Sequence, residues 1–304
     1  MAEPVIQIKD LHKYYGAVHA VEGLTLEVNK GEVFGFLGPN GAGKTTTIRC
    51  MLNFVFPTSG ELRLLNKNPV EHGPQIMKEV GYIAGEIALY DNYRVRDFLN
   101  MLEDVRGEKG ALRAELLQRF QLDESRKIKN LSKGNKQKVA IVQAFMHLPL
   151  LLVLDEPTSG LDPLLQLEFY KLIDETKQRG GTVFFSSHLL EEVQRLSDRA
   201  AIIKKGKLIS LETISELRSK NIYNVSVHYK GREPKTQDFG AQNVENFTLI
   251  DHSAQLTYKG DVNALLEILN NYELVDLRIT EPSLEDMFLA YYENDEETAD
   301  TDKS

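Results

Sequence analysis

The sequence predicts an α/β fold built on a mainly parallel sheet, followed by a small separate α+β domain. Short apolar runs alternate with helical stripes as far as about residue 220. Strands that alternate with helices favour a parallel sheet covered on both faces. After Lys220 the pattern changes to strict alternation of apolar and polar residues, which is typical of half-buried strands. The length of 304 residues agrees with two domains at roughly 150 residues each.

Apolar alternation and turn residues place the first elements. Strands are expected at residues 5–8, 24–28 and 33–37, with turns at residues 15–16 and 29–31. A helix follows, because apolar residues from Ile48 to Val55 recur at i, i+3, i+4 and i+7. Further helices are expected over residues 95–102, 112–120 and from about 135, then strands at 150–154 and 182–187 and a helix from Leu189.

The last part of the chain is expected to fold by itself. Its expected strands lie at residues 223–229, 247–249, 256–258 and 275–279, and its helices at 262–269 and from Ser283. The expected domains are therefore residues 1–220, with a helical part at about 90–148, and residues 221–292. Residues 293–304 contain six acidic residues and predict a disordered acidic tail.

Composition excludes several classes of protein. The net charge is −9, and residues 221–304 hold 17 acidic against 6 basic residues. Nucleic-acid binders need clustered positive charge, so no nucleic-acid partner is expected. The single cysteine, Cys50, excludes an internal disulfide framework. No apolar run reaches the roughly 18 residues of a membrane span, and no signal peptide opens the chain, so neither a membrane-embedded nor a secreted protein is expected.

Residues 38–45 (GPNGAGKT) match the phosphate-binding pattern G-x-x-x-x-G-K-[ST], between an expected strand and an expected helix. The glycines let backbone N–H groups turn inward around a phosphate, and the positive end of the helix points at the same phosphate. Lys44 would add a charge between the β and γ phosphates, and Thr45 would offer its hydroxyl to Mg²⁺. The segment therefore predicts a nucleotide-binding loop.

Two acidic residues, Asp155 and Glu156, follow the apolar strand at residues 150–154. Adjacent carboxylates at the end of a buried strand are costly unless a cation or a reaction uses them. Beside a phosphate site, Asp155 is expected to hold Mg²⁺, and Glu156 to accept a proton from the attacking water or to orient that water.

Three further segments add to this pattern: residues 131–135 (LSKGN), residues 159–162 (SGLD) and His188. Together with the phosphate loop and the acidic pair, they resemble the signature sequence, the D-loop and the switch histidine of the ATP-binding cassette (ABC) ATPases. The resemblance covers residues 5 to about 217. It implies that residues 1–220 form a P-loop, RecA-like ATP-binding cassette with a helical subdomain, and that ATP and Mg²⁺ are its ligands.

The resemblance also implies roles for individual residues. Tyr15 would stack on the adenine, and His188 would hold or sense the γ-phosphate. The signature and D-loop residues Ser132, Gly134 and Asp162 would reach the ATP of a second cassette in a head-to-tail pair. Lys44, Glu156 and His188 form the expected catalytic set. The expected nucleotide-binding loop comprises Gly38, Pro39, Asn40, Gly41, Ala42, Gly43, Lys44, Thr45 and Thr46.

The sequence departs from the family's pattern in two places. Lys133 stands where the usual signature, LSGGQ, has glycine, and it adds a cation near the partner's phosphates. Gly85 and Glu86 stand where the family usually places a glutamine that touches Mg²⁺ and the attacking water. Glu86, or a water molecule, is expected to take that place beside Thr45 and Asp155.

The leading interpretation is the ATPase subunit of a bacterial ABC exporter that drives a separate membrane permease. The subunit would lie peripherally at the cytoplasmic face of the membrane and pair with itself or with a sibling cassette. Residues 82–96 would form the docking surface, with Tyr90, Asp91, Asn92 and Tyr93 exposed. Residues 279–288 (ITEPSLEDMF) resemble the end of cassettes from bacitracin-type, daunorubicin-type and sodium-extruding exporters.

Three alternatives remain open from the sequence. The first is a soluble ABC ATPase of translation or DNA repair, although those classes usually carry two cassettes or a long coiled coil. The second is the ATPase of an importer. The third is a regulatory subunit that binds ATP with little turnover, which Gly85 at the expected glutamine position keeps open.

Overall fold

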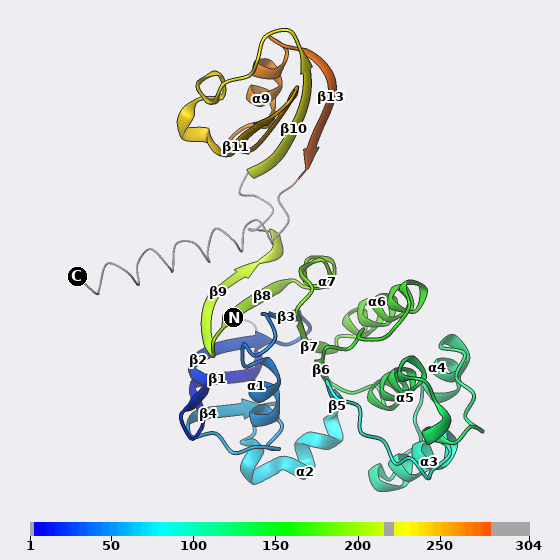
Figure 1. The fold of residues 1–304 in the computed structure, drawn as a ribbon. Helices are drawn as coiled ribbons and strands as arrows, with labels where there is room; N and C mark the ends of the chain where they lie inside the picture. The colour runs from blue at the N-terminus through cyan, green and yellow to red at the C-terminus, as the bar shows by residue number, and fades with distance from the viewer. Residues whose placement is uncertain (1–2, 216–221, 281–304) are drawn as a thin grey trace. The chain divides into compact units, whose positions relative to one another are not determined.

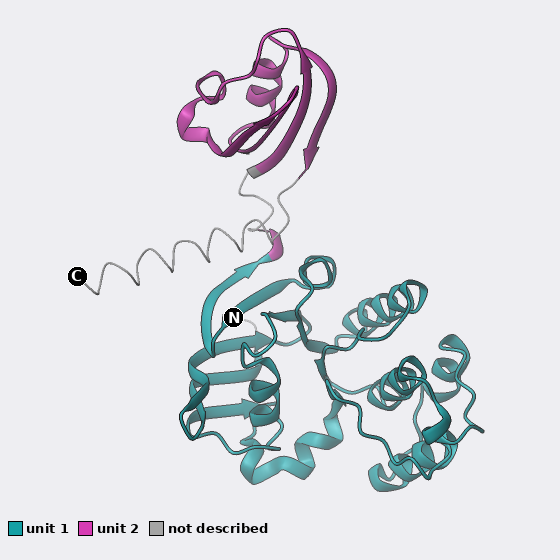
Figure 2. Ribbon diagram, in the orientation of Figure 1, with its two compact units in different colours: residues 1–213 teal, residues 214–304 magenta. Residues whose placement is uncertain are grey.

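The computed structural model describes residues 3–215 and 222–280 and has two compact units, residues 1–213 and residues 214–304 (Figure 2). The boundary between them lies close to the change of sequence pattern near residue 220. The expected helix from Ser283 and the expected acidic tail at residues 293–304 lie outside the described residues.

A six-stranded sheet forms the centre of the first unit, in the order β5-β6-β7-β3-β8-β9 (Figure 1). All neighbouring pairs are parallel except β8 with β9, which confirms the expected mainly parallel sheet. Every residue of β3, β6 and β7 is buried, which is why these strands have continuous apolar runs in the sequence. The strands are β3 (Val33–Leu37), β5 (Val80–Ile83), β6 (Leu151–Asp155), β7 (Thr182–Ser187), β8 (Arg199–Lys204) and β9 (Lys207–Thr213).

A three-stranded antiparallel sheet packs against this centre. Its strands are β1 (Pro4–Tyr15), β2 (Val18–Asn29) and β4 (Ser59–Leu64), in the order β2-β1-β4. Its inner residues share one hydrophobic core with helix α1 (Lys44–Met51) and with aromatic residues of the central sheet, such as Phe34 and Phe184. Burying this apolar surface holds the start of α1, and therefore the loop before it, against the sheet.

The described part of this unit also contains the 3-10 helix η1 (Ile128–Asn130) and six further α-helices: α2 (Pro69–Glu79), α3 (Val95–Arg106), α4 (Arg113–Arg119), α5 (Lys133–Phe145), α6 (Pro163–Gln178) and α7 (Leu190–Leu196). Helices α3, α4 and α5 gather together beyond the β5 end of the sheet (Figure 1). Arg119 joins them to α6, because its guanidinium donates to Glu168 at 3.1 Å and to Glu175 at 2.8 Å. In the described residues no helix is long and apolar enough to cross a membrane.

The second unit contains a four-stranded antiparallel sheet and one described α-helix. The elements are β10 (Ile222–Lys230), β11 (Val244–Ile250), β12 (Ser253–Lys259), α9 (Val262–Leu269) and β13 (Glu273–Thr280), with sheet order β11-β12-β10-β13. All of these elements were expected. Alternate residues of β10, namely Val225, Val227 and Tyr229, enter a core with Leu265 and Leu269 of α9. The strict alternation in the sequence arises because only one face of the sheet is buried.

Candidate nucleotide-binding site

The loop from Gly38 to Gly43 connects β3 to α1 and requires its glycines. Gly41 and Gly43 have φ of 80° and 103°, in the left-handed region that favours glycine. A Cβ on Gly43 would lie 2.3 Å from the carbonyl oxygen of Ala20, and one on Gly38 would lie 2.5 Å from that of Ile203. The loop is thus pressed against its neighbours, and α1 begins at Lys44 with its free N–H groups facing the loop.

A cavity of about 250 Å³ opens beside this loop. Positions 39–46 of the expected nucleotide-binding set line it, together with Val18, His19, Ala20 and Glu156. Gly38 is not part of the lining, and its carbonyl oxygen accepts a hydrogen bond from Lys44 Nζ at 2.6 Å. The lining therefore combines backbone N–H groups, a cation and hydroxyls, which is the chemistry that binds a phosphate.

Lys44 is buried, with only 6% of its surface exposed. Its ammonium donates to the carbonyl oxygens of Gly38 and Pro39 and lies 3.2 Å from Glu156 Oε1. That carboxylate oxygen has no hydrogen-bond partner among the described residues, so the contact with Lys44 is an ion pair without hydrogen-bond geometry. The structure thus brings together the two side chains expected to hold the phosphates and to activate water.

Asp155 is fully buried at the end of β6. Its Oδ2 accepts a hydrogen bond from Thr45 Oγ1 at 2.7 Å, and its Oδ1 accepts one from Ser186 Oγ at 2.5 Å. Burial and the nearby Asp155 carboxylate raise the pKa of Tyr82 to about 12. Among the described residues, no group of three or more His, Cys, Asp or Glu side chains is arranged so that it could hold a metal ion. Thr45 and Asp155 nevertheless fit Mg²⁺, because this ion uses one or two protein oxygens beside substrate phosphates and waters.

The backbone at Gly85 lies close to the carboxylate of Asp155. A Cβ on Gly85 would lie 2.9 Å from Asp155 Oδ2. Glu86 is exposed, and within the described part of the chain no hydrogen bond or ion pair joins it to Asp155 or Thr45. The structure therefore places Gly85, and not the Glu86 side chain, next to the acidic residue expected to bind the metal.

Glu156 is held in an unusual backbone conformation. Its φ is 50°, which is uncommon for a residue with a side chain. Its N–H donates to the carbonyl oxygen of Ser186 at 3.2 Å, and its Oε2 lies 2.6 Å from His188 Nδ1. In this contact Nδ1–H donates to the carboxylate, which leaves Nε2 free to accept a proton or a hydrogen bond. The structure brings Lys44, Glu156 and His188 together as expected.

Other expected site residues lie outside the cavity lining. Tyr15 is 47% exposed, and Lys13 Nζ lies 4.8 Å from its ring centroid. Its register partner in β2 is Val18, which does line the cavity. Ser132 and Asp162 are exposed N-caps: Ser132 Oγ accepts from Asn135 N–H, and Asp162 Oδ1 accepts from Leu165 N–H.

The signature and D-loop segments touch each other within this chain. A Cβ on Gly134 would lie 2.9 Å from the carbonyl oxygen of Gly160, and Lys133 Nζ lies 3.4 Å from Ser159 Oγ. Gln137, buried on α5, donates to the carbonyl oxygen of Pro157. Helix α5 therefore packs along the stretch of chain that follows Glu156.

The sequence interpretation missed several residues of this site. Ser186 bonds both Asp155 and Glu156, and His19 lines the cavity. Glu192 is buried on α7 and accepts a hydrogen bond from Ser187, the residue before His188. A signal was present, since Ser186 and Ser187 are polar residues at the end of an otherwise apolar strand. Buried polar side chains generally form hydrogen bonds, so the bonds made by Ser186 and Ser187 could have been anticipated.

Comparison with known proteins agrees with this geometry. The family model described as ABC transporter matches residues 21–159. The bacitracin transport ATP-binding protein BcrA of Bacillus licheniformis is 34% identical over 296 residues, which cover 94% of this chain and 96% of that protein.

Solved structures give the same result. The ATP-binding subunit of an ABC transporter has a TM-score of 0.66 at 30% identity and covers 70% of this chain and 92% of its own. A second structure is a dimeric ATP-binding cassette in a post-hydrolysis state, bound to ADP and Pi. It has a TM-score of 0.62 at 23% identity, and the match covers 69% of this chain and 98% of that chain. At this identity it supports the fold alone. The chain therefore belongs to the ABC transporter family, as one of its ATP-binding subunits, and is an ATPase.

Proposed function

We propose that this ATPase is the energy-supplying subunit of an exporter, bound at the cytoplasmic face of a membrane to a separate permease. The convergence of Lys44, Asp155, Glu156 and His188 on the phosphate-loop cavity carries the proposal, because binding and cleavage of ATP need a cation, a metal site and a base in one place. A relative named for bacitracin transport, which this chain matches over 96% of its length, supports the assignment to transport.

Each residue has a task in this proposal. The loop N–H groups and Lys44 bind the β and γ phosphates, and Thr45 with Asp155 holds Mg²⁺, which neutralises phosphate charge when bound. Glu156 takes a proton from the attacking water or orients it. His188 holds the Glu156 carboxylate through Nδ1 and presents Nε2 to the γ-phosphate. Tyr15, exposed at the end of β1, stacks on the adenine.

A second cassette completes the site in this proposal. Ser132 and Asp162 cap their helices on the surface, outside the cavity lining, and so can meet a partner chain. Gly134 lies beside Ser132 at the same helix start, where free N–H groups attract a phosphate. A similar cassette that has been solved is a dimer. The partner is a second copy of this chain or a sibling cassette, and ATP closes the pair.

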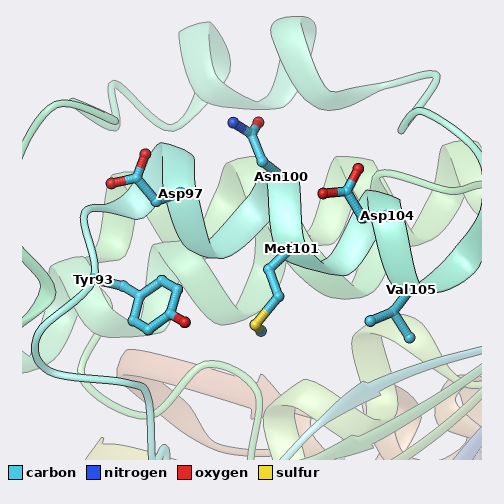
Figure 3. A pocket seen from close by; sticks show the side chains of 6 residues that line it. All are labelled: Tyr93, Asp97, Asn100, Met101, Asp104 and Val105. Carbon is cyan, nitrogen blue, oxygen red and sulfur yellow. The ribbon is translucent and has the colours of Figure 1, made fainter.

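The permease is proposed to dock on helix α3. A cavity of about 490 Å³, here called the α3 pocket, lies along this helix and is lined by Tyr93, Asp97, Asn100, Met101, Asp104 and Val105 (Figure 3). Asp97, Asn100 and Asp104 lie along one edge of the helix face that lines the pocket, whereas Met101 and Val105 lie along its other edge, towards Tyr93 (Figure 3). The expected docking residues Tyr90, Asp91, Asn92 and Tyr93 are all exposed. An acidic edge beside an apolar floor suits a cytoplasmic helix with basic and apolar faces.

Charge reversal in the α3 pocket is expected to uncouple the chain from its permease. Asp97→Lys with Asp104→Lys should weaken permease binding about tenfold, equivalent to roughly 1.4 kcal/mol, because like charges then face each other. ATP hydrolysis by the isolated chain should stay unchanged. Glu115→Lys on α4 is the matched control, since it reverses an exposed charge outside the pocket. Equal permease binding by all three proteins would refute docking at this pocket.

Gly85→Ala is expected to lower kcat several-fold. The added Cβ would lie 2.9 Å from Asp155 Oδ2, so either the carboxylate or the Gly85 segment must move. Small displacements of groups at a reacting centre are expensive. Steady-state ATPase assays over a range of Mg²⁺ concentrations measure the effect, which should include a higher Mg²⁺ requirement. Gly73→Ala is the control, because a Cβ there meets nothing within 4 Å. Identical Mg²⁺ curves for the two variants would contradict the metal assignment.

Co-purification tests the proposed function as a whole. A tagged chain is expressed in its native host, recovered from detergent-solubilised membranes and analysed by mass spectrometry. Recovery of a stoichiometric multi-span membrane protein is expected. Recovery of ribosomal or DNA-associated proteins in its place would favour the translation or repair alternative. Reconstitution of the recovered complex in vesicles then distinguishes export from import by the direction of transport.

A further inference from the structure

Glu192 is a buried carboxylate that the proposed chemistry does not use directly. It lies in the first turn of α7, four residues after His188, and is 4% exposed. Its Oε1 accepts hydrogen bonds from Thr158 Oγ1 and, at 3.4 Å, from the hydroxyl of Tyr170. Its Oε2 accepts a hydrogen bond from Ser187 Oγ at 2.7 Å. All three donors are neutral hydroxyls, so burial of this charge is costly and needs a reason.

The three donors come from three different segments of the site. Thr158 lies two residues after Glu156 and just before the D-loop, and Ser187 lies directly before His188. Tyr170 is on α6, the helix that follows the D-loop. Burial and Glu192 raise the pKa of Tyr170 to about 12, and its protonated hydroxyl donates to Glu192. One carboxylate therefore ties together the segments that carry Glu156, the D-loop and His188.

The His188 side chain needs such support. It is 46% exposed, so its position depends on the backbone that carries it and on the contact with Glu156. Ser187 Oγ accepts a hydrogen bond from Leu189 N–H at 2.9 Å while it donates to Glu192. The residues on both sides of His188 are thereby held through Ser187. On the other side, Thr158 holds the chain two residues from Glu156.

We propose that Glu192 is a positioning residue that keeps His188 and Glu156 in register for ATP hydrolysis. The inference rests on the roles proposed above for these two residues. Glu192 touches neither of them in this arrangement and acts through Ser187 and Thr158. This role depends on the buried hydrogen bonds that Glu192 accepts. If these bonds are lost, ATP hydrolysis is expected to fail even though the phosphate loop is intact.

Glu192→Gln is expected to lower kcat about 10- to 100-fold, because a small displacement of a catalytic group has effects of this size. KM for ATP should change less than about twofold, since Glu192 does not line the phosphate-loop cavity. Glu191→Gln is the matched control: it removes a charge from the same turn of α7, but the residue is exposed. A full kcat for Glu192→Gln, or an equal loss for Glu191→Gln, would overturn the proposal.

A double-mutant cycle separates positioning from general destabilisation. In a His188→Ala background, Glu192→Gln should cost less in kcat than it does in the wild type, because the part of its effect that passes through Ser187 to His188 is already lost. Full additivity would show that Glu192 does not act through His188. If Glu192→Gln does not fold, Ser187→Ala replaces it in the cycle, because it removes one of the three donors and keeps the carboxylate.

Amide hydrogen exchange tests the inference without hydrolysis. Glu192→Gln should raise exchange at Ser159 and Leu161, after Glu156, and at Leu189, after His188, while exchange in α1 stays unchanged. Unchanged exchange in both segments would refute the positioning role. If the wild-type chain hydrolysed no ATP, the proposed function would fail, yet this measurement would still decide the role of Glu192.

Discussion

Glu156→Gln should lower kcat for ATP hydrolysis by about 10²- to 10⁴-fold while ATP is still bound. The amide keeps the size of the side chain but cannot take a proton from water. The amide oxygen can still accept the hydrogen bond from His188 Nδ1, so the loss is chemical and not conformational. Because bound ATP is no longer consumed, the variant is expected to accumulate as a dimer with ATP. Steady-state assays and light scattering with and without ATP measure the two effects.

The controls for this variant separate the remaining alternatives. Glu191→Gln should retain wild-type turnover, since that residue is exposed and outside the cavity. A Glu156→Gln protein with more than about a tenth of wild-type activity would show that another group acts as the base. If the wild type is no faster than Glu156→Gln, the chain is a regulatory subunit with little turnover. A variant that stays monomeric with ATP counts against the proposed homodimer.

Lys44→Ala should weaken ATP binding at least about 100-fold, which corresponds to roughly 2.7 kcal/mol. The Lys44 side chain is 6% exposed and its ammonium lies among the carbonyl oxygens of the phosphate loop, so its charge acts on the phosphates with little screening by water. Its loss also leaves Glu156 Oε1 without the cation 3.2 Å away. Isothermal titration calorimetry with ATP and Mg²⁺ measures the change in affinity.

Lys207→Ala provides the comparison for Lys44→Ala. Lys207 follows Gly206, whose N–H bonds the loop residue Ala42, but its side chain is exposed and pairs with Glu22. Lys207→Ala also removes one positive charge close to the phosphate loop. The ATP affinity should stay within about twofold of the wild-type value, because exposed ion pairs contribute little. Unchanged affinity for Lys44→Ala would disprove the phosphate-loop assignment. Equal losses for both variants would indicate a nonspecific effect of net charge.

Unbroken apolar patterns predicted several elements from the sequence, whereas the interrupted pattern of α2 did not. The buried strands β3, β6 and β7 and the stripes of α3, α4 and α5 were expected and are present. Helix α2 was missed, because Pro74 lies inside it and His72 has a non-helical φ of −124°. A helix after the strand at residues 150–154 was expected but without bounds, although Asp162 caps α6 and Pro163 begins it, since Asp162 was interpreted only as a partner contact.

The sequence by itself determined the nucleotide chemistry of this protein. A phosphate loop works through consecutive backbone N–H groups and the start of the next helix, so eight adjacent residues are enough to identify it. The acidic pair at the end of a buried strand is similarly local. Even the departure at Gly85 was visible, although only the structure shows that this backbone lies next to Asp155.

The tertiary structure decided which distant residues meet. Strands β6, β7 and β3 are neighbours in a parallel sheet, so the residues at their carboxyl ends gather at one edge. That order brings Ser186 to Asp155 across 31 residues and Thr158 to Glu192 across 34. No local pattern encodes such contacts, because they depend on strand order and on burial of the whole sheet. The phosphate site could therefore be named from the sequence, whereas the buried network that holds its catalytic residues in register could be seen only in the folded chain.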